Sequence, residues 1–295
     1  MHKTIGILSP GVMGHAVGRV LGEAGLHVVT CLAGRSAITH ERAKKAAMVG
    51  LADIDAVVAA SDMILAILPP ADALGLARSV AAAMTATRFS PVYVDCNAVS
   101  PATAREIARM MAAVKAPFID AGIIGGPPER GYAPRIYCSG PETGPLMALD
   151  GSGIAVKDAG PEIGAASGIK MCYAGLTKGT MTLHAAVLIA AERMGLRDLL
   201  WRELETSQEK AAEAMKTTTP FLPADSARWV GEMEEIAKTF DQAGLPSGFH
   251  DAAADIFRLL ARSHFASETR ETMNKDRTLD QAVRAFADLV EDGDG

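Results

Sequence analysis

A glycine-containing turn near the N-terminus has residue types and spacing suited to binding phosphate. Ser9, Gly11 and Gly14 follow a short apolar run and precede a segment with helical periodicity. Gly11 lets the backbone approach a pyrophosphate, and Gly14 lets the helix pack close to the strand. Val12 and Met13 fall in the first helical turn, whose N–H groups and positive dipole end attract anions. The pattern is a dinucleotide-binding fingerprint with Ser9 in place of the first glycine; the alternative is a purely structural turn.

The residues after the second strand-like run, 27–32, bear on which dinucleotide would bind. An acidic residue there would accept hydrogen bonds from the ribose hydroxyls of NAD, but the chain has CLAGRSAIT at this point. Arg35 and Ser36 could instead hold the 2′-phosphate of NADP through charge-assisted hydrogen bonds. The sequence therefore favours NADP over NAD, and the alternative is that Arg35 is a solvated loop residue.

Alternating strand and helix patterns must position these residues. The pattern predicts strands over 3–8, 27–32, 62–68 and 91–95, and further short strands near 117–120, 135–138 and 153–156. It predicts helices over 37–49, 53–60, 71–84 and 101–113, besides the one that begins in the phosphate turn. Strands that alternate with helices indicate βαβ units and a parallel sheet. We therefore expect an α/β fold of the Rossmann type.

The second half of the chain has a different character. Residues 157–168 are rich in Gly and Pro, and a long Ala-rich helix is predicted over 168–194, followed by several shorter helices. We predict an NADP-binding domain over 1–160 and an all-helical substrate and dimerisation domain over 161–295. The long helix is apolar on more than one face and aromatic residues are scarce, so we expect two copies to associate as a homodimer.

Composition narrows the class of protein. The 295 residues are 49% hydrophobic and 22% charged, which is typical of a globular protein. The net charge of 29 − 35 = −6 argues against a nucleic-acid partner, which would require a basic face. The four cysteines form no CxxC pair and are expected to be buried free thiols. The longest apolar run, 185–191, is too short for a bilayer span. We expect a cytoplasmic protein with a small-molecule substrate.

Several further segments resemble the β-hydroxyacid dehydrogenase family, which includes 6-phosphogluconate dehydrogenase and 3-hydroxyisobutyrate dehydrogenase. The resemblance covers nearly the whole chain. Besides the phosphate turn, it is carried by DMILAILPPADA (62–73), VDCNAVSP (94–101), DAGIIGG (120–126) and GAASGIKMCYAG (164–175). It implies that Leu68 and Pro69 lie in a loop over the cofactor and Asn97 lies near nicotinamide and substrate. It also implies substrate binding by the segment with Ile124, Gly125 and Gly126, and a catalytic lysine at Lys170.

Three positions depart from the family pattern. The substrate motif usually has a Ser where this chain has Ile124, and the long helix usually has an Asn where this chain has Ala174. A lysine of the C-terminal domain corresponds to Gly231. With these polar groups missing, we expect a bulkier and more apolar substrate than 3-hydroxyisobutyrate.

Lysine chemistry suits the reaction that the resemblance implies. As an ammonium, Lys170 can protonate the alkoxide formed when a carbonyl is reduced; in the oxidative direction it must first lose that proton. Lys178 lies about 80° around the same helix and roughly 12 Å along it, and could bind a substrate anion in place of the missing Ser. The alternative for Lys178 is a surface or interface role.

The remaining candidates have simpler alternatives. Asn97 could hydrogen-bond nicotinamide or substrate, or could form an Asx turn before the helix at Pro101. Gly125 and Gly126 could offer backbone N–H groups to substrate or simply form a tight turn. We expect a solvated helical face at Glu232, Glu234 and Glu235, and we expect no metal site.

Together these features predict an NADP-dependent dehydrogenase or reductase of β-hydroxy compounds. An imine reductase is the alternative enzyme, although such relatives generally replace the lysine that Lys170 resembles. A non-catalytic NADP-binding sensor is the alternative outside enzymes.

Overall fold

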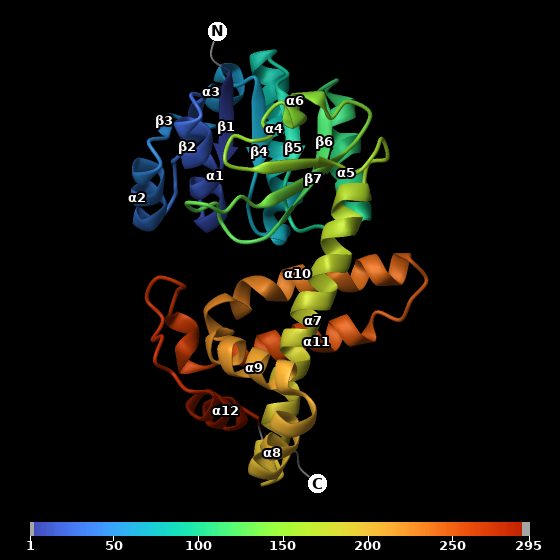
Figure 1. Cartoon of the computed structure of the whole chain (residues 1–295). Coiled ribbons are helices and arrows are strands. Elements are labelled where there is room, and N and C mark those ends of the chain that lie inside the picture. The colour runs from blue at the N-terminus through green and yellow to red at the C-terminus, as the bar shows by residue number, and fades with distance from the viewer. Residues whose placement is uncertain (1–2, 291–295) are drawn as a thin grey trace. The chain divides into compact units, whose positions relative to one another are not determined.

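The computed structural model describes residues 3–290. The chain divides into two compact units, residues 1–173 and 174–295. The first is α/β and the second is all-helical (Figure 1). The first unit extends past the boundary expected near residue 160 and includes the start of α7 (Ala165–Arg193).

The first unit is built on one eight-stranded sheet with the order β3-β2-β1-β4-β5-β6-β7-β8. Its strands are β1 (Thr4–Leu8), β2 (His27–Cys31), β3 (Val49–Leu51), β4 (Met63–Ala66), β5 (Val92–Asp95), β6 (Phe118–Ile124), β7 (Arg135–Ser139) and β8 (Ala155–Asp158). Every neighbouring pair is parallel except β6 and β7, which are antiparallel. The sheet is therefore mainly parallel, as predicted, with one reversed pair.

Helices cover both faces of this sheet (Figure 1). They are α1 (Val12–Glu23), α2 (Ala37–Lys45), α3 (Ile54–Ala60), α4 (Ala73–Thr87), which follows a 3-10 turn at Pro70–Asp72, α5 (Pro101–Ala113) and α6 (Gly144–Met147). Side chains of α1, α2 and α6 share one apolar cluster with the sheet, and those of α3, α4 and α5 share another. Strands that bury both faces read as continuous apolar runs, which is why β4 (MILA) was predictable.

The prediction was wrong at β3. We expected a helix over 37–49, but α2 ends at Lys45 and Val49–Leu51 forms an edge strand paired with β2. Only three residues long, with Val49 and Gly50 exposed, the strand has no apolar pattern that could identify it.

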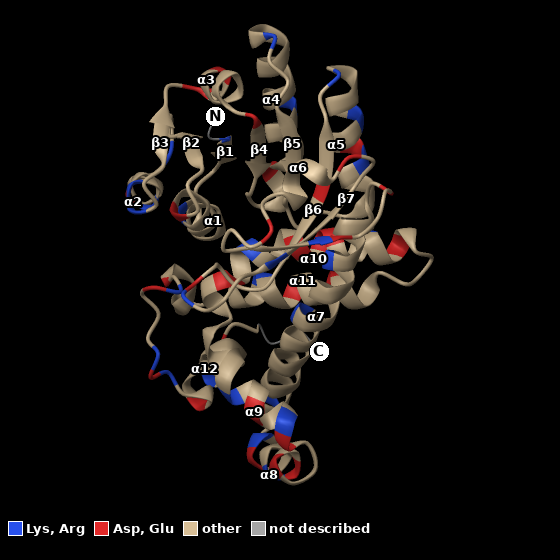
Figure 2. Cartoon of the chain, turned by 45° about the horizontal axis from the view of Figure 1, so that its top comes forward, with Lys and Arg blue, Asp and Glu red and all other residues tan. Residues whose placement is uncertain are grey.

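The second unit contains the rest of α7 followed by α8 (Arg197–Ser207), α9 (Glu209–Thr218), α10 (Pro223–Gln242), α11 (Gly248–Leu260) and α12 (Leu279–Ala287), with 3-10 turns at Thr219–Phe221 and His264–Ser267. Trp229 of α10 meets Phe257 of α11 edge to face, with ring centroids 5.3 Å apart. Residues of both charge signs are mixed along α8 and α10 (Figure 2). No helix within residues 3–290 is long and apolar enough to cross a membrane.

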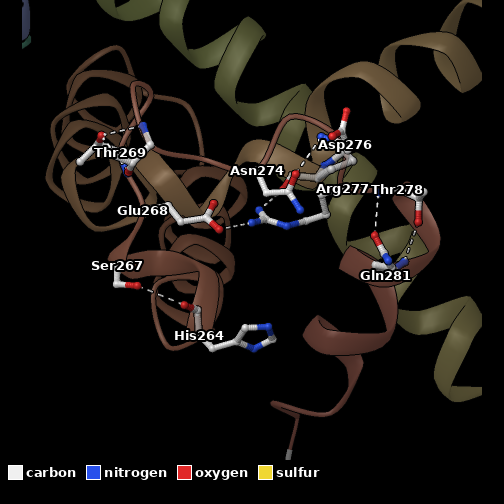
Figure 3. Close-up of polar contacts among 11 residues, drawn as sticks. His264, Ser267, Glu268, Thr269, Asn274, Asp276, Arg277, Thr278 and Gln281 are labelled. Atoms are coloured by element: carbon white, nitrogen blue, oxygen red, sulfur yellow. Dashed lines mark hydrogen bonds and ion pairs between the residues drawn. The ribbon is translucent and has the colours of Figure 1, made fainter.

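The segment between α11 and α12 is held by a buried arginine (Figure 3). Arg277 donates to the Pro220 carbonyl at 2.9 Å, pairs with Glu268 and lies 3.5 Å from the centroid of Phe265. Thr278 and Gln281 then cap the start of α12 reciprocally. These contacts are internal to the second unit and stabilise the segment between α11 and α12, whose only regular structure is the 3-10 turn at His264–Ser267.

Candidate active site

The phosphate turn between β1 and α1 is tight, and α1 begins directly after it. Ser9 adopts a left-handed conformation with φ 69°, the conformation usually left to glycine. A Cβ on Gly14 would lie 2.7 Å from the Ser9 carbonyl oxygen, so only glycine allows α1 to approach this turn. A Cβ on Gly11 would meet nothing within 4 Å, and the first turn of α1 contains no acidic residue. Open space at Gly11 and the first amides of a helix, which have no intrahelical acceptor, fit a pyrophosphate.

The parallel strands bring the other predicted cofactor residues to the same edge. Strands β2, β1, β4, β5 and β6 are consecutive neighbours and parallel, so the loops after them share one edge of the sheet. The chain reverses its strand order between β1 and β4, where doubly wound sheets bind ligands. Residues predicted after all five of these strands therefore lie along one edge.

Arg35 and Ser36 lie between β2 and α2. Ser36 is the N-cap of α2, and its hydroxyl accepts a hydrogen bond from the Thr39 amide at 3.3 Å. The Arg35 side chain is exposed and forms no hydrogen bond or ion pair with the residues that the structure describes. Its guanidinium is therefore available to a ligand, whereas the Ser36 hydroxyl already has a capping role.

Asn97 connects the loops after β4 and β5. Its Oδ1 accepts a hydrogen bond from the Leu68 amide at 2.7 Å, and its Nδ2 donates to Asp95. Its side chain is buried. Both ends of the amide are engaged within the first unit, so the second Nδ2 hydrogen is the donor that remains for a ligand.

The glycine pair after β6 is covered by a residue that the sequence analysis missed. The Gly126 amide donates to the Tyr132 phenol oxygen at 3.1 Å. Ile124 is buried and contributes no polar group. Tyr132 could have been suspected only from its place in a short turn, ERGY, after the glycine pair.

A buried carboxylate fixes the start of α7, which the sequence analysis also missed. Asp120 of β6 is fully buried and its Oδ2 accepts from Ser139 Oγ (2.9 Å) and from the Gly164 and Ser167 amides (2.9 and 3.1 Å). Its Oδ1 accepts from Ser167 Oγ at 2.5 Å. These four hydrogen bonds place a negative charge at the positive end of a helix dipole.

Lys170 lies one helical turn beyond this anchor. A Cβ on Gly122 would be 2.7 Å from the Lys170 Cβ and 3.0 Å from the Ala166 carbonyl oxygen, so α7 packs directly on β6 at this glycine. Gly122 is three residues before Gly125, roughly 10 Å along the strand. The packing thus brings half-buried Lys170 towards the carboxyl end of β6.

Lys178 has a different environment, within the second unit. It is buried, its Nζ lies 2.9 Å from Glu232 Oε2, and it sits 5.2 Å from the centroid of Trp229. Glu232 also accepts from Arg228 at 3.0 Å. The expectation of a solvated Glu232 was wrong because its carboxylate is buried between two cations. A substrate anion at Lys178 would have to compete with Glu232.

Burial shifts the pKa of several groups. Desolvation lowers the pKa of His184 and of His250, and Asp251 partly opposes the shift at His250. His250 is buried, and its ring centroid lies 4.2 Å from that of Phe240 and 5.2 Å from that of Phe249. Burial raises the pKa of Cys96, and raises that of Cys138 to about 11, so neither thiol is an activated nucleophile.

All four cysteines are free. The expectation that all are buried was wrong for Cys172, which is exposed, and for Cys31, which is half-buried. No group of three His, Cys, Asp or Glu side chains is arranged to hold a metal in the part of the chain that is described.

Comparisons with known proteins find relatives for segments of both units. Residues 4–144 match the family described as the NAD binding domain of 6-phosphogluconate dehydrogenase, and residues 191–260 match a domain of unknown function, DUF1932. An uncharacterized 28.5 kDa protein of Methanothermus fervidus is 30% identical over 214 residues, which are 72% of this chain and 81% of that protein.

Solved structures share the fold. A conserved protein of unknown function, described as structurally similar to 3-hydroxyacid dehydrogenases, is 27% identical with a TM-score of 0.62, covering 87% of this chain and 96% of that one. A Mycobacterium tuberculosis 3-hydroxyisobutyrate dehydrogenase, solved with L-serine, is 18% identical with a TM-score of 0.67, covering 97% and 99%.

Proposed function

Since this chain belongs to the β-hydroxyacid dehydrogenase-like family and is an NAD(P)-dependent oxidoreductase, we propose that it transfers a hydride between NADP and a β-hydroxy compound or the corresponding carbonyl. Lys170 is the proton acceptor and donor. The observation that carries the proposal is the packing of α7 on β6 at Gly122, which brings this lysine to the strand that ends at the substrate motif. The hydrogen bonds from the Gly164 and Ser167 amides to Asp120 hold the start of α7 at this position on β6.

The residues along the sheet edge would hold the dinucleotide. The amides of Val12, Met13 and Gly14, next to the open space at Gly11, would donate hydrogen bonds to a pyrophosphate, and Arg35 would pair with the 2′-phosphate of NADP. The backbone of Ser9, Leu68 and Pro69 borders the same edge, and Asn97 fixes the Leu68 loop by its 2.7 Å hydrogen bond. Bound NADP supplies the hydride acceptor, and NADPH the donor.

Lys170 accepts the substrate proton in one direction of the reaction and donates it in the other. During oxidation, its neutral amine takes the hydroxyl proton as the carbinol carbon loses its hydride. During reduction, its ammonium returns a proton to the oxygen that becomes negative as the carbonyl carbon gains a hydride. The hydrogen bonds at the start of α7 hold Lys170 in place for both oxidation and reduction. Neither proton transfer requires the backbone to move.

A dehydrogenase assay tests the proposal. Purified protein with NADP should oxidise at least one member of a panel of 3-hydroxy acids, followed by absorbance at 340 nm, and NAD should be a poorer cofactor. We expect the highest kcat/KM on an aryl- or alkyl-substituted member, because Ile124 and Ala174 replace polar groups of the family pattern. Glycerate or 3-hydroxyisobutyrate as the best substrate would contradict that preference. Reduction of cyclic imines without oxidation of any hydroxy acid would favour an imine reductase.

We also propose a homodimer. Support comes from large apolar residues exposed along α7, just after it and on α8, with exposed fractions of 71% at Leu176, 50% at Leu183, 64% at Met194 and 61% at Leu199. A second copy would remove these from water. Light scattering that gives a monomer mass at micromolar concentration would contradict this part of the proposal.

A further inference from the structure

A phenol lies directly over the glycine pair that follows β6. A Cβ on Gly125 would be 2.0 Å from the Tyr132 Oη, and Gly125 itself has φ +117°, a conformation that L side chains rarely adopt. The next amide, that of Gly126, donates to the same oxygen at 3.1 Å. Glycine at 125 thus makes room for the Tyr132 phenol as well as for the turn.

The position of Tyr132 is built by its surroundings. Glu129 and Tyr132 exchange two backbone hydrogen bonds of 3.1 and 3.0 Å across a tight turn, in which Gly131 has φ +81°. The preceding Pro128 carbonyl accepts a hydrogen bond of 3.0 Å from Arg19 of α1. The segment that carries the phenol is therefore tied to the helix whose N-terminus forms the phosphate turn.

The hydrogen bond between Gly126 and Tyr132 determines which polar groups of this turn can bind a ligand. The Gly126 amide is taken by the phenol oxygen, so a substrate reaches that amide only by displacing Tyr132. The phenol has accepted one hydrogen bond, and its own O–H donates to no acceptor among residues 3–290. The side chain is 42% exposed and Ile124 is apolar and buried. The polar donor presented at the substrate motif is therefore the Tyr132 hydroxyl.

We propose that Tyr132 determines substrate specificity by donating its phenol hydrogen to an acceptor oxygen, above all a carboxylate, at the end of the substrate away from the reacting carbon. This inference rests on the proposed function. The phenol supplies a hydroxyl where the residue before the glycine pair, Ile124, has none. Its ring gives an aromatic surface to an apolar substrate body. Lys170, above Gly122 on the same strand, acts at the other end of the substrate.

The test compares Tyr132→Phe with Tyr137→Phe. Tyr137 lies on β7 of the same unit and its hydroxyl has no hydrogen-bond partner among the residues that are described, so its variant controls for the loss of a phenol. Binding is measured by calorimetry on protein saturated with NADPH, because NADPH and an alcohol cannot react. The probes are 3-hydroxy-3-phenylpropanoate and 1-phenylpropan-1-ol, which lacks the carboxylate. Turnover of the carboxylate is measured separately with NADP.

We expect Tyr132→Phe to weaken binding of 3-hydroxy-3-phenylpropanoate about 10- to 100-fold, the range for a hydrogen bond to a charged group. Its KM should rise by a similar factor with little change in kcat. Binding of 1-phenylpropan-1-ol and of NADPH should not change, and Tyr137→Phe should resemble wild type throughout.

Two results would overturn the inference: Tyr132→Phe that binds the carboxylate as wild type does, or wild-type protein that binds the carboxylate no more tightly than the alcohol. Failure of the proposed function looks different. If the protein binds the carboxylate through Tyr132 but never reduces NADP with it, the inference about Tyr132 stands and the proposed dehydrogenase activity is contradicted.

Discussion

Helix α7 carries two lysines with opposite surroundings. Lys170 is half-buried above Gly122, next to a helix start held by four hydrogen bonds to Asp120 that all come from uncharged donors. Lys178 is buried and pairs with Glu232 at 2.9 Å. The start of α7 in the first unit is held through Asp120, whereas in the second unit Lys178 itself forms a buried ion pair. We propose proton transfer for Lys170 because it packs on the strand that ends at the substrate motif, and a role in stability for the pair of Lys178 and Glu232.

The largest effect on stability is expected at the buried pair. Glu232→Gln leaves the buried Lys178 ammonium without its carboxylate and should lower the free energy of unfolding by about 3–5 kcal/mol. Lys178→Met should lower it by less, because Glu232 keeps its ion pair with Arg228. The double variant Lys178→Met/Glu232→Leu should recover part of the loss, because no buried charge then remains at 178 or 232. Guanidinium unfolding measures all three. Single variants within about 1 kcal/mol of wild type would contradict a structural role for the pair.

The anchor at Asp120 should be the next most sensitive. In Asp120→Asn the NH2 group of the new side chain would face hydrogen-bond donors of Ser139, Gly164 or Ser167. Hydrogen bonds to a charged acceptor are lost, so the free energy of unfolding should fall by about 2–3 kcal/mol. Because Lys170 follows the anchored turn, kcat should also fall while the NADPH dissociation constant holds. Ser139→Ala removes one of the four hydrogen bonds and should cost less. Equal losses in the two variants would argue against the carboxylate as the centre of the anchor.

Arg35 probes the cofactor edge of the first unit, in the loop after β2. Arg35→Asp should weaken NADPH binding by about 1.5–3 kcal/mol, because a charged hydrogen bond to the 2′-phosphate is lost, and should leave NADH binding nearly unchanged. Arg88→Asp is the control: it makes the same change in net charge just after α4, at the far end from the phosphate turn. Fluorescence titration gives both constants. Wild-type protein with equal affinity for NADPH and NADH would contradict the preference.

The smallest effect concerns pH and the second unit. Burial lowers the pKa of His250 in the folded state below its unfolded value of about 6.5. The unfolded chain therefore binds the proton more readily, and the stability that neutral His250 contributes above that pH is lost as pH falls towards the folded pKa. His250→Gln should lose less Tm than wild type between pH 7.5 and pH 5.5, by a few degrees at most. If Tm depends on pH in the same way in both proteins, groups other than His250 cause the loss of stability in acid.

The sequence predicted those parts of the first unit that depend on local patterns. Buried parallel strands such as β4 are continuous apolar runs, and the phosphate turn is a short motif whose residues are all within six positions. Edge strand β3 lacks such a pattern because it is three residues long and partly exposed.

Two of the missed features join residues far apart in the chain, and the third depends on a turn. Asp120, Ser139 and Ser167 come from three elements, and no local spacing signals that they meet. Glu232 looked solvated because its partner Lys178 lies on another helix, 54 positions earlier. Tyr132 escaped notice because its role depends on the bend that the chain makes at Gly125.

The contrast between the two lysines is tested most directly by Lys170→Ala in a single-turnover experiment with bound NADPH and a carbonyl substrate found in the panel assay. The rate of NADPH oxidation should fall about a hundredfold to ten-thousandfold, the usual contribution of a positioned acid or base, while the NADPH dissociation constant and the free energy of unfolding stay close to wild type. A variant that keeps more than roughly a third of the wild-type rate would show that Lys170 does not transfer the proton.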